Sequence, residues 1–274
     1  MAEAIEFFKY QGAGNDFVMI DNITSGTHTL SHDQISRLCD RRFGIGADGL
    51  IELRPATEPD DAALAFVMVY YNSDGGRATF CGNGARCACA FARQLGLVEV
   101  DKEFVFRADD GLHTAVCHSD AKALVDISMR NVDEVACEPN GAYVLDTGVP
   151  HYVEFVTSVD DVDIMARAPK IRYAERYAPA GVNVNFVSKT SANSISIRTY
   201  ERGVEGETLA CGTGITASAI AAALSQSVRG KGVCEVQAQG GQLMVSFNIV
   251  DEHTVRSVRL CGPATFVFKG QVTI

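Results

Sequence analysis

The pattern of apolar and polar positions predicts a chain made mostly of short strands. Short segments either alternate apolar with polar positions or are apolar throughout, and turn residues separate them. A succession of such segments joined by short turns is typical of antiparallel sheets. The expected strands cover residues 5–10, 17–20, 50–53, 64–71, 103–106, 112–117, 123–129, 142–145, 151–156, 182–187, 194–200, 233–236, 242–249, 255–260 and 264–268.

Four segments favour helices, and two of them have an unusual composition. Residues 31–42 and 160–178 combine helical periodicity with many charged positions, which is typical of helices on the surface. Residues 83–95 and 213–227 instead carry small apolar side chains on nearly every side of the predicted helix. A helix without a polar face is buried, so strands should surround each of these two.

A repeated motif opens each of the two apolar helices. The sequence Cys81-Gly82-Asn83-Gly84 ends an extended segment and starts the first helix, and Cys211-Gly212-Thr213-Gly214 does the same 130 positions later. That spacing is close to half of the 274 residues. The approach to each motif also repeats, since Asn72 precedes the first cysteine by nine positions and Glu201 precedes the second by ten. Two copies of one unit indicate an active site shared between two halves.

These patterns predict an α+β protein with two pseudo-symmetric lobes. Each lobe should be a mainly antiparallel, curled sheet wrapped round one buried central helix. The pattern weakens after residue 128, so we expect residues 1–128 to form the N-terminal lobe with Cys81, and residues 129–263 to form the C-terminal lobe with Cys211. From the pattern alone, the strand at 264–268 could complete either lobe.

Composition narrows the cellular setting and the partners. The net charge of −10 disfavours nucleic acid and anionic membranes, and no apolar run approaches the roughly 20 residues of a membrane span. The N-terminus lacks the basic flank and apolar core of a secretion signal, so we expect a cytoplasmic protein. Nine cysteines, an odd number without a C-x-x-C pair, argue against a disulfide framework and against a structural zinc site.

A cysteine at a helix N-terminus is suited to acid–base chemistry. The free N–H groups and the partial positive charge of the helix end favour a thiolate and also bind a carboxylate. If the two halves face each other, Cys81 and Cys211 flank one ligand, and mutual repulsion leaves one proton on the pair. Such a pair can remove a proton from one face of a carbon and return one to the other face. The expected reaction is racemisation or epimerisation.

The G-x-G-x-x-G match at Gly44–Gly49 does not predict a nucleotide site. It follows a helix and leads into a strand, which is the reverse of the order in dinucleotide-binding folds. The other seven cysteines are expected to be small buried residues without a chemical role. They are residues 39, 87, 89, 117, 137, 234 and 261.

Five motifs together resemble the signatures of the diaminopimelate epimerase family, and the match runs nearly end to end. The resemblance implies an isomerase without cofactor or metal, which interconverts LL- and meso-diaminopimelate with two cysteines in lysine and peptidoglycan-precursor biosynthesis. It also implies that the final strand returns to the N-terminal lobe, which then includes residues 264–274, and that the protein is often a homodimer. The motifs are Gly12–Phe17, Cys81–Arg86, Pro150-His151, Tyr200–Gly203 and Ala210–Gly214.

The resemblance also implies a set of site residues. Cys81 and Cys211 are the catalytic pair, and His151 and Glu201 assist the thiols. The backbones of Gly82-Asn83 and Gly212-Thr213 hold the carboxylate or ammonium end of the substrate at the reacting carbon. A zwitterionic amino acid needs such donors and acceptors in a site closed to water. The other substrate-binding residues are Asn15, Asn72, Asn183 and the pair Glu201-Arg202.

Two departures from the family pattern bear on the choice of substrate. Val149 stands where many members have an asparagine, and Gly49 stands where some have a glutamine. Other two-cysteine enzymes, such as proline or hydroxyproline epimerases, therefore remain an alternative, and an isomerase related to the phenazine pathway is a weaker one. From a different class, a thiol redox-sensing, amino-acid binding protein would use the same two cysteines as a regulatory disulfide.

Overall fold

The computed structural model describes residues 4–26, 28–57, 63–119 and 123–273. The chain divides into two compact units, the N-terminal unit Met1–Ile127 with Gly262–Ile274 and the C-terminal unit Ser128–Cys261. The helices within the described ranges are α1 (His32–Cys39), α2 (Gly82–Gln94), α3 (Ile164–Arg172), α4 (Gly212–Leu224) and the short 3-10 helix η2 (Glu175–Tyr177).

The N-terminal unit is a mainly antiparallel sheet with two parallel pairings. Strand β1 pairs antiparallel with β2 and with β18, β2 pairs parallel with β3, and β3 pairs antiparallel with β4. Strand β4 then pairs parallel with β6, and β6, β7 and β8 form an antiparallel meander. The strands are β1 (Ala4–Gly12), β2 (Asn15–Asp21), β3 (Gly49–Arg54), β4 (Leu64–Asn72), β5 (Arg77–Ala78), β6 (Glu103–Ala108), β7 (Gly111–Cys117), β8 (Leu124–Ser128) and β18 (Thr265–Thr273).

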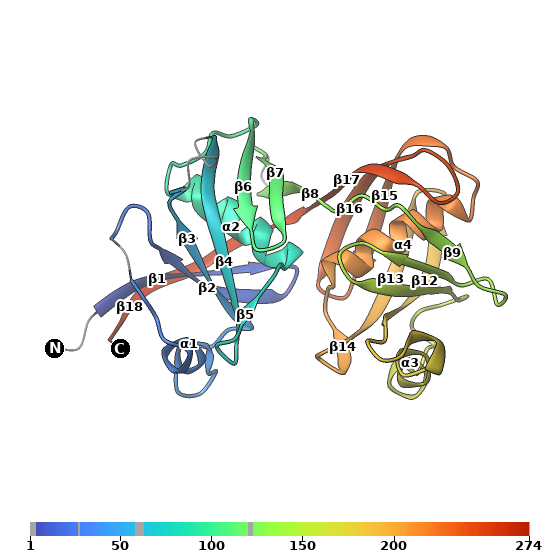
Figure 1. The fold of residues 1–274 in the computed structure, drawn as a ribbon, viewed down its shortest axis with the longest axis horizontal. Helices are drawn as coiled ribbons and strands as arrows, with labels where there is room; N and C mark the ends of the chain where they lie inside the picture. The colour runs from blue at the N-terminus through green and yellow to red at the C-terminus, as the bar shows by residue number, and fades with distance from the viewer. Residues whose placement is uncertain (1–3, 27, 58–62, 120–122, 274) are drawn as a thin grey trace. The chain divides into compact units, whose positions relative to one another are not determined.

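The C-terminal unit repeats the same order of pairings. Strands β10 and β11 form an antiparallel pair, β11 pairs parallel with β12, β12 antiparallel with β13, and β13 parallel with β15 before the antiparallel run β15 to β17. Helix α2 follows β5, and α4 follows β14, at matching positions (Figure 1). The predicted α+β repeat is confirmed. The strands are β9 (Val135–Cys137), β10 (Tyr143–Asp146), β11 (Pro150–Phe155), β12 (Asn183–Ser191), β13 (Ser194–Glu201), β14 (Gly206–Thr208), β15 (Gly230–Ala238), β16 (Gly241–Ile249) and β17 (Val255–Pro263).

Helices α2 and α4 are the buried centres of their units, as the small side chains predict. Helix α2 packs against β1, β2, β3, β4, β7 and β18, while α4 packs against β10 to β13, β15 and β16. Residues Cys87, Ala88, Ala217 and Ala221 are wholly buried. Small side chains let strands approach a helix on several sides without leaving voids. Each cysteine motif is therefore held at the end of a rigid, enclosed helix.

The hairpin between β1 and β2 is tighter than the sequence suggests. Only Ala13 and Gly14 form the turn, and both have positive φ angles, 54° and 83°. Two successive residues with positive φ form the two-residue turn whose twist matches that of antiparallel strands. Asn15 and Asp16, expected in the turn, consequently belong to β2 and have positions fixed by the ladder.

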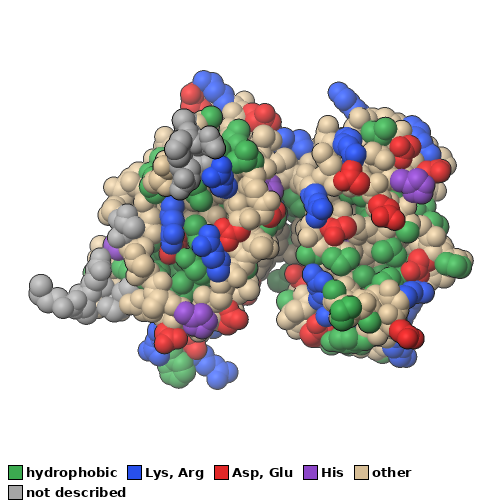
Figure 2. All heavy atoms as spheres, in the orientation of Figure 1, with side chains coloured by type: hydrophobic (Ala, Val, Ile, Leu, Met, Phe, Trp, Pro, Cys, Tyr) green, Lys and Arg blue, Asp and Glu red, His purple; other side chains and the backbone are tan. Residues whose placement is uncertain are grey.

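The surface helices are shorter than predicted. Helix α1 begins with a capping box formed by Ser31 and Gln34 but ends at Cys39, because Asp40 adopts an extended conformation. Helix α3 begins only after Asp163, whose carboxylate accepts from the N–H of Ala166 at 3.0 Å. No helix in the described ranges is long and apolar enough to cross a membrane. On the face drawn in Figure 2, side chains of both charges are interspersed.

Candidate active site

Cys81 is the N-cap residue of α2. Its backbone is extended (φ −144°, ψ 117°), and its carbonyl accepts from the N–H of Ala85 at 2.8 Å to close the first turn. The thiol does not cap the helix, and instead Sγ donates to Oδ1 of Asn15 at 3.6 Å. The same oxygen accepts from Nδ2 of Asn83 at 3.4 Å. Strand β2 and the helix entrance thus bring together Asn15, Cys81 and Asn83, as predicted from the sequence.

A buried arginine fixes the orientation of Asn83. Arg86 is wholly buried on α2, and its Nη2 donates to Oδ1 of Asn83 at 2.7 Å, while Nη1 donates to the carbonyl of Gly82 at 3.3 Å. A guanidinium can only donate, so the oxygen of Asn83 must face Arg86 and its NH2 group must face Asn15. The Gly82-Asn83 entrance of the helix is therefore held from inside the unit.

Charged residues support the start of β2 beside this cluster. Nζ of the buried Lys9 lies 2.8 Å from Oδ2 of Asp16, and Nη2 of Arg41 lies 2.6 Å from Oδ1. Burial would raise the pKa of Asp16, but hydrogen bonds from Arg41 and Lys9 outweigh it and lower the pKa to about 2. Asp16 is thus a carboxylate at every physiological pH.

Cys211 occupies the equivalent position in the C-terminal unit. It is the N-cap residue of α4 with an extended backbone (φ −104°, ψ 110°), and its carbonyl accepts from the N–H of Ile215 at 2.8 Å. The side chain is buried, and Sγ lies 3.4 Å from Oγ1 of Thr213. That hydroxyl also lies 2.9 Å from Nε2 of His151. The hydroxyl of Thr213 therefore contacts both His151 and the sulfur of Cys211.

The hydrogen bonds of Asn185 determine where His151 carries its proton. Nδ2 of Asn185 donates to the carbonyl of Tyr152 at 3.0 Å, and its Oδ1 accepts from the hydroxyl of Thr199 at 2.9 Å. Since a carbonyl cannot donate, the NH2 group must face that way, and it also faces Nδ1 of His151 at 3.0 Å. Nδ2 of Asn183 faces Nε2 at the longer distance of 3.5 Å, so Nδ1 accepts in the shorter contact and the proton of the neutral ring is on Nε2.

The neutral form of His151 follows from its surroundings. The ring is wholly buried, and burial together with the positive charge of Arg202 lowers its pKa to about 3. With its proton on Nε2, the ring donates to Oγ1 of Thr213, and the hydroxyl hydrogen of Thr213 remains for the sulfur of Cys211. A hydrogen bond donated to sulfur favours the thiolate over the thiol.

Asn183, Glu201 and Arg202 lie in the same cluster. The N–H of Arg202 donates to Oδ1 of Asn183 at 2.7 Å, which ties the end of β13 to the start of β12. Burial raises the pKa of Glu201, and hydrogen bonds to its carboxylate from Thr208 and then from Cys211 oppose this rise. The C-terminal unit thus brings together the predicted residues His151, Asn183, Glu201, Arg202, Cys211, Gly212 and Thr213.

Asn72, a predicted substrate-binding residue, has a less direct setting. Asn72 lies at the exposed end of β4, where its backbone pairs with Gly49 and its N–H donates to the carbonyl of Gly76 at 2.9 Å.

Gly49 stands where some family members have a glutamine, and the space around it is restricted. A Cβ atom there would lie 2.5 Å from the carbonyl oxygen of Tyr71 and 2.7 Å from the ring of Tyr70, so no larger residue fits.

The second glycine of each cysteine motif allows a close approach. A Cβ atom at Gly214 would lie 2.5 Å from Oδ1 of Asn185 and 3.2 Å from Cε1 of His151. At Gly84 it would lie 2.8 Å from Cδ1 of Ile51. Glycine thus allows a close approach at both helix entrances, and the requirement is stricter at Gly214, because the neighbour of Gly84 is the end of the flexible Ile51 side chain.

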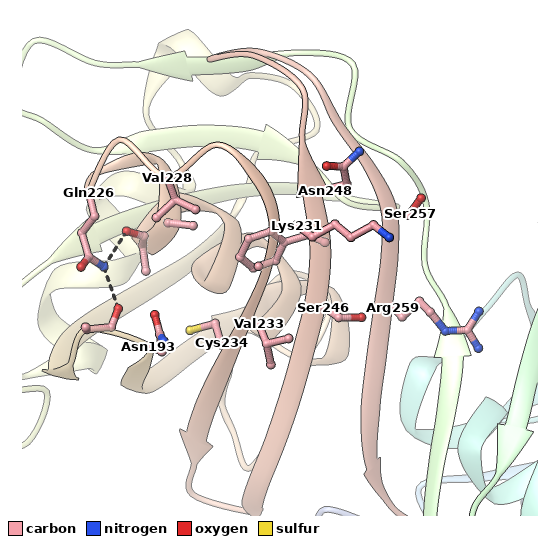
Figure 3. A pocket seen from close by; sticks show the side chains of 15 residues that line it. Asn193, Gln226, Val228, Lys231, Val233, Cys234, Ser246, Asn248, Ser257 and Arg259 are labelled. Atoms are coloured by element: carbon pink, nitrogen blue, oxygen red, sulfur yellow. Dashed lines mark hydrogen bonds between the residues drawn. The ribbon is translucent and has the colours of Figure 1, made fainter. Parts of the chain in front are cut away.

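A separate cavity of about 630 Å³ lies in the C-terminal unit. It is lined from the end of α4, the turn between β12 and β13, and strands β15 to β17 (Figure 3). Gln226 bridges its rim by donating to the carbonyls of Ala192 and Ala222, each at 3.1 Å. It contains none of the predicted site residues. Across the ranges that the structure describes, no cluster of three or more His, Cys, Asp or Glu side chains could hold a metal.

Solved structures share the fold at low sequence identity. A Bacillus anthracis phenazine biosynthesis protein of the PhzF family matches with a TM-score of 0.75 and 13% identity, covering 99% of this chain and 100% of that one. A hydroxyproline epimerase from Agrobacterium vitis matches with a TM-score of 0.68 and 14% identity, covering 99% and 93%. At such identities the likeness shows the fold alone.

Sequence relatives are much closer. The sequence model of the family described as diaminopimelate epimerase matches residues 7–133 and 143–267. The diaminopimelate epimerase of Flavobacterium psychrophilum is 46% identical, over 97% of this chain and 99% of the relative. That of Chlorobaculum tepidum is 38% identical, over 96% and 99%. On this match across nearly its whole length, the chain belongs to the diaminopimelate epimerase family of isomerases.

Proposed function

We propose that this protein interconverts LL- and meso-diaminopimelate in lysine and peptidoglycan-precursor biosynthesis, without a cofactor and with Cys81 and Cys211 as its acid–base pair. One observation carries the proposal. Each cysteine is the N-cap residue of the central buried helix of its unit, and the two units have the same strand order. We assign one sulfur of the acid–base pair to each unit.

The proposed reaction needs one thiolate and one thiol at the start of a turnover. One sulfur takes the α-proton, and the electron pair left on carbon is delocalised into the substrate carboxylate. The N–H groups at the entrances of α2 and α4 are suited to bind that carboxylate as its charge grows. The other thiol then gives its proton to the opposite face of the carbon, which inverts the centre and leaves the pair with its protons exchanged.

The two sulfurs have different hydrogen-bond partners. The thiol of Cys81 donates to Asn15, whereas Cys211 is placed to receive the hydroxyl hydrogen of Thr213. His151 orients that hydroxyl, and the carboxylate of Glu201 accepts from the thiol of Cys211 when this sulfur carries a proton. We therefore assign both as assistants of the second thiol.

The remaining polar groups have proposed roles in holding the substrate. Asn15, Asn72 and Asn183 supply amide groups, the Glu201-Arg202 pair supplies both charges, and the backbones of Gly82-Asn83 and Gly212-Thr213 supply N–H donors. A zwitterion with two amino-acid ends requires such a mixture of donors and acceptors.

Labelling from solvent tests the mechanism. With LL-diaminopimelate in heavy water, the meso product formed early should carry deuterium at the inverted carbon, while the unreacted substrate stays largely unlabelled. The acid thiol exchanges with solvent before turnover, whereas the base does not return its proton to the face it came from. Equal early labelling of both isomers, or turnover only with an added cofactor, would contradict the proposal. Parallel assays with proline and hydroxyproline test the choice of substrate.

We further propose that the protein is a cytoplasmic homodimer. Three consecutive apolar residues of β18, Phe266, Val267 and Phe268, have exposed fractions of 42%, 51% and 44%. Side chains alternate along a strand, so Phe266 and Phe268 lie on one face of β18 and Val267 lies on the other, and together they form an exposed apolar patch on both faces of this strand. Exposed apolar side chains of this kind are typical of protein interfaces. All nine cysteines are free thiols, which fits a reducing compartment.

A further inference from the structure

Asn15 lies between the thiol of Cys81 and a carboxylate that the sequence did not single out. Its Oδ1 accepts from Cys81 at 3.6 Å, and its Nδ2 donates to Oδ2 of Asp48 at 2.7 Å. Asp48 lies 33 positions away, just before β3, which pairs parallel with β2. The two ends of one amide group therefore contact two different chemical groups.

Asp48 determines which end of the amide faces the thiol. A carboxylate accepts hydrogen bonds and has none to donate, so the NH2 group of Asn15 must face Asp48. The amide is planar, so its oxygen must then face Cys81. An asparagine without such a neighbour could present either end.

The opposite side of Asn15 imposes the same orientation independently. Arg86 can only donate and holds the oxygen of Asn83, which turns the NH2 group of Asn83 toward Asn15. Only an oxygen can accept from it. Two anchors of opposite polarity, a carboxylate on one side and a guanidinium on the other, thus agree on one orientation of Asn15.

Asp48 is itself held on both carboxylate oxygens. Oδ1 accepts from Nη2 of Arg41 at 2.7 Å, and Oδ2 accepts from the N–H of Asp16 at 3.2 Å besides Asn15. The backbone N–H of Asp48 donates to the carbonyl of Asp16 at 3.0 Å. The carboxylate therefore cannot rotate away from Asn15 without losing several hydrogen bonds, although it is partly exposed.

We propose that Asp48, held by Arg41, is a positioning residue that fixes the Asn15 amide with its oxygen toward Cys81. This keeps Cys81 a hydrogen-bond donor, and it presents an acceptor to the ligand, which suits the ammonium group of an amino acid and disfavours a carboxylate at this point. The inference rests on the proposed function for its part in turnover. The orientation itself depends only on the N-terminal unit.

The test measures the reactivity of Cys81 without any substrate. Iodoacetamide alkylation at neutral pH is followed for each thiol by peptide mass, with the exposed Cys137 of the other unit as the internal reference. Asp48→Ala should raise the alkylation rate of Cys81 about three- to tenfold, because the thiol hydrogen loses a fixed acceptor and the thiolate becomes more populated. The rate at Cys137 should not change.

A double variant separates positioning from a general loosening of the fold. If Asp48 acts through Asn15, then Asp48→Ala should have no further effect in an Asn15→Ala background. Asp109→Ala is the matched control, since Asp109 forms a comparable bidentate ion pair with Arg77 in the same unit, with N–O distances of 2.6 and 2.7 Å. It should leave the rate at Cys81 unchanged.

Arg41→Gln provides a second route if Asp48→Ala does not fold, because the Arg41 side chain is 57% exposed. It should shift the rate in the same direction by a smaller factor. Unchanged reactivity of Cys81 in the folded variants, or an equal increase with and without Asn15, would overturn the inference. Either result would leave the labelling experiment unaffected, since alkylation requires no turnover.

Discussion

Neighbouring groups that can only donate or only accept hydrogen bonds orient the key amide groups in both clusters. The carbonyl of Tyr152 can only accept, and it fixes Asn185, which in turn fixes the proton of His151. The carboxylate of Asp48 fixes Asn15 in the same way. A group that can only accept, or only donate, cannot reverse its role. The chemical nature of each neighbour and its distance therefore determine the orientation of the amide.

Replacing either cysteine should separate catalysis from folding. Cys81→Ser and Cys211→Ser should each abolish epimerisation, because a serine hydroxyl is far too weak an acid to become the base. The fold should persist, since the side chains differ by one atom. Isomer interconversion measures the activity, and the thermal unfolding midpoint measures the fold. Turnover near that of the wild type in either variant would exclude the assigned pair.

The buried His151 should make the protein sensitive to acid. In the unfolded chain a histidine takes up a proton near pH 6.5, whereas in the folded protein burial lowers the pKa of His151 to about 3. The unfolded state therefore binds more protons in this window, and stability is lost as pH falls from about 6.5 to about 3. The slope should be about 1.4 kcal/mol per pH unit for this one proton.

Denaturant unfolding across that pH window checks the sign. His151→Gln should reduce the free energy of unfolding at pH 7.5 but flatten its decline toward pH 4.5. His32→Gln is the control, because the His32 side chain is 65% exposed and its loss should leave the slope unchanged. Equal slopes for His151→Gln and the wild type would show that the pKa of His151 is not lowered in the folded protein.

Sequence reasoning found most residues of each cluster but missed their anchors. Asn185 could have been found, because it follows Asn183 by two positions on a strand and so lies on the same face. Asp48 could not, because its link to Asn15 depends on the parallel pairing of β2 with β3. Nothing in the spacing of the two residues predicts that pairing.

At the scale of elements, the turn between β13 and β14 carries Arg202 directly after Glu201, the last residue of β13. It is as long as its counterpart between β4 and β5, and the extra residue before Cys211 lies in β14. Glu205 in this turn contacts α3. Its carboxylate accepts from Nη2 of Arg172 at 3.0 Å and from the hydroxyl of Tyr173 at 2.6 Å. The hydrogen bond from Tyr173 is the main cause that lowers the pKa of Glu205 to about 2.

Loss of the Glu205 charge should weaken substrate binding more than turnover. Glu205→Gln should raise KM about three- to tenfold with little change in kcat, because the turn that presents Arg202 is no longer held to α3. Glu154→Gln is the matched control, since Glu154 also pairs with an arginine of α3, Arg167, but does not contact the turn. A fall in kcat at constant KM would instead place Glu205 in the chemistry.

The elements that were mispredicted share a physical cause. Strands β5, β9 and β14 have only two or three residues, too few for an alternating pattern to appear. The helix expected over 160–178 is reduced to α3, because Asp163 caps its start and the backbone of Tyr173 leaves the helical region. Long periodic segments were predicted well, since burial on one face leaves a clear signal.

At the scale of the whole molecule, the repeat was visible in the sequence because it is tied to chemistry. In the proposed reaction each helix entrance presents a thiol, free N–H groups and a backbone that packs closely on the neighbouring strand. The Cys-Gly-x-Gly motif supplies these features, and it is present in each half. The residues that contact the sulfurs differ, with Asn15 at Cys81 and Thr213 at Cys211. In the proposed two-base reaction the two sulfurs exchange protonation states in each turnover, so each of these different surroundings has to serve a thiol and a thiolate in turn.

The association of two copies can be tested at the centre of the apolar patch on β18. The rings of Phe266 and Phe268 contact Tyr10 and Phe7 within the unit, at 5.6 and 5.9 Å between centroids, so changing them would disturb the fold. Val267 alternates to the other face of the strand and is half exposed.

Val267→Asp should therefore weaken the homodimer while leaving the monomer folded. A charge buried at an interface without a partner costs several kcal/mol, so the dissociation constant should rise by at least about a hundredfold. Sedimentation equilibrium over a range of concentrations measures it. Leu112→Asp is the control, because Leu112 is 61% exposed on β7 of the same unit and lies outside the patch. A wild-type protein that is monomeric at every concentration, or an equal effect of both variants, would remove β18 as the interface.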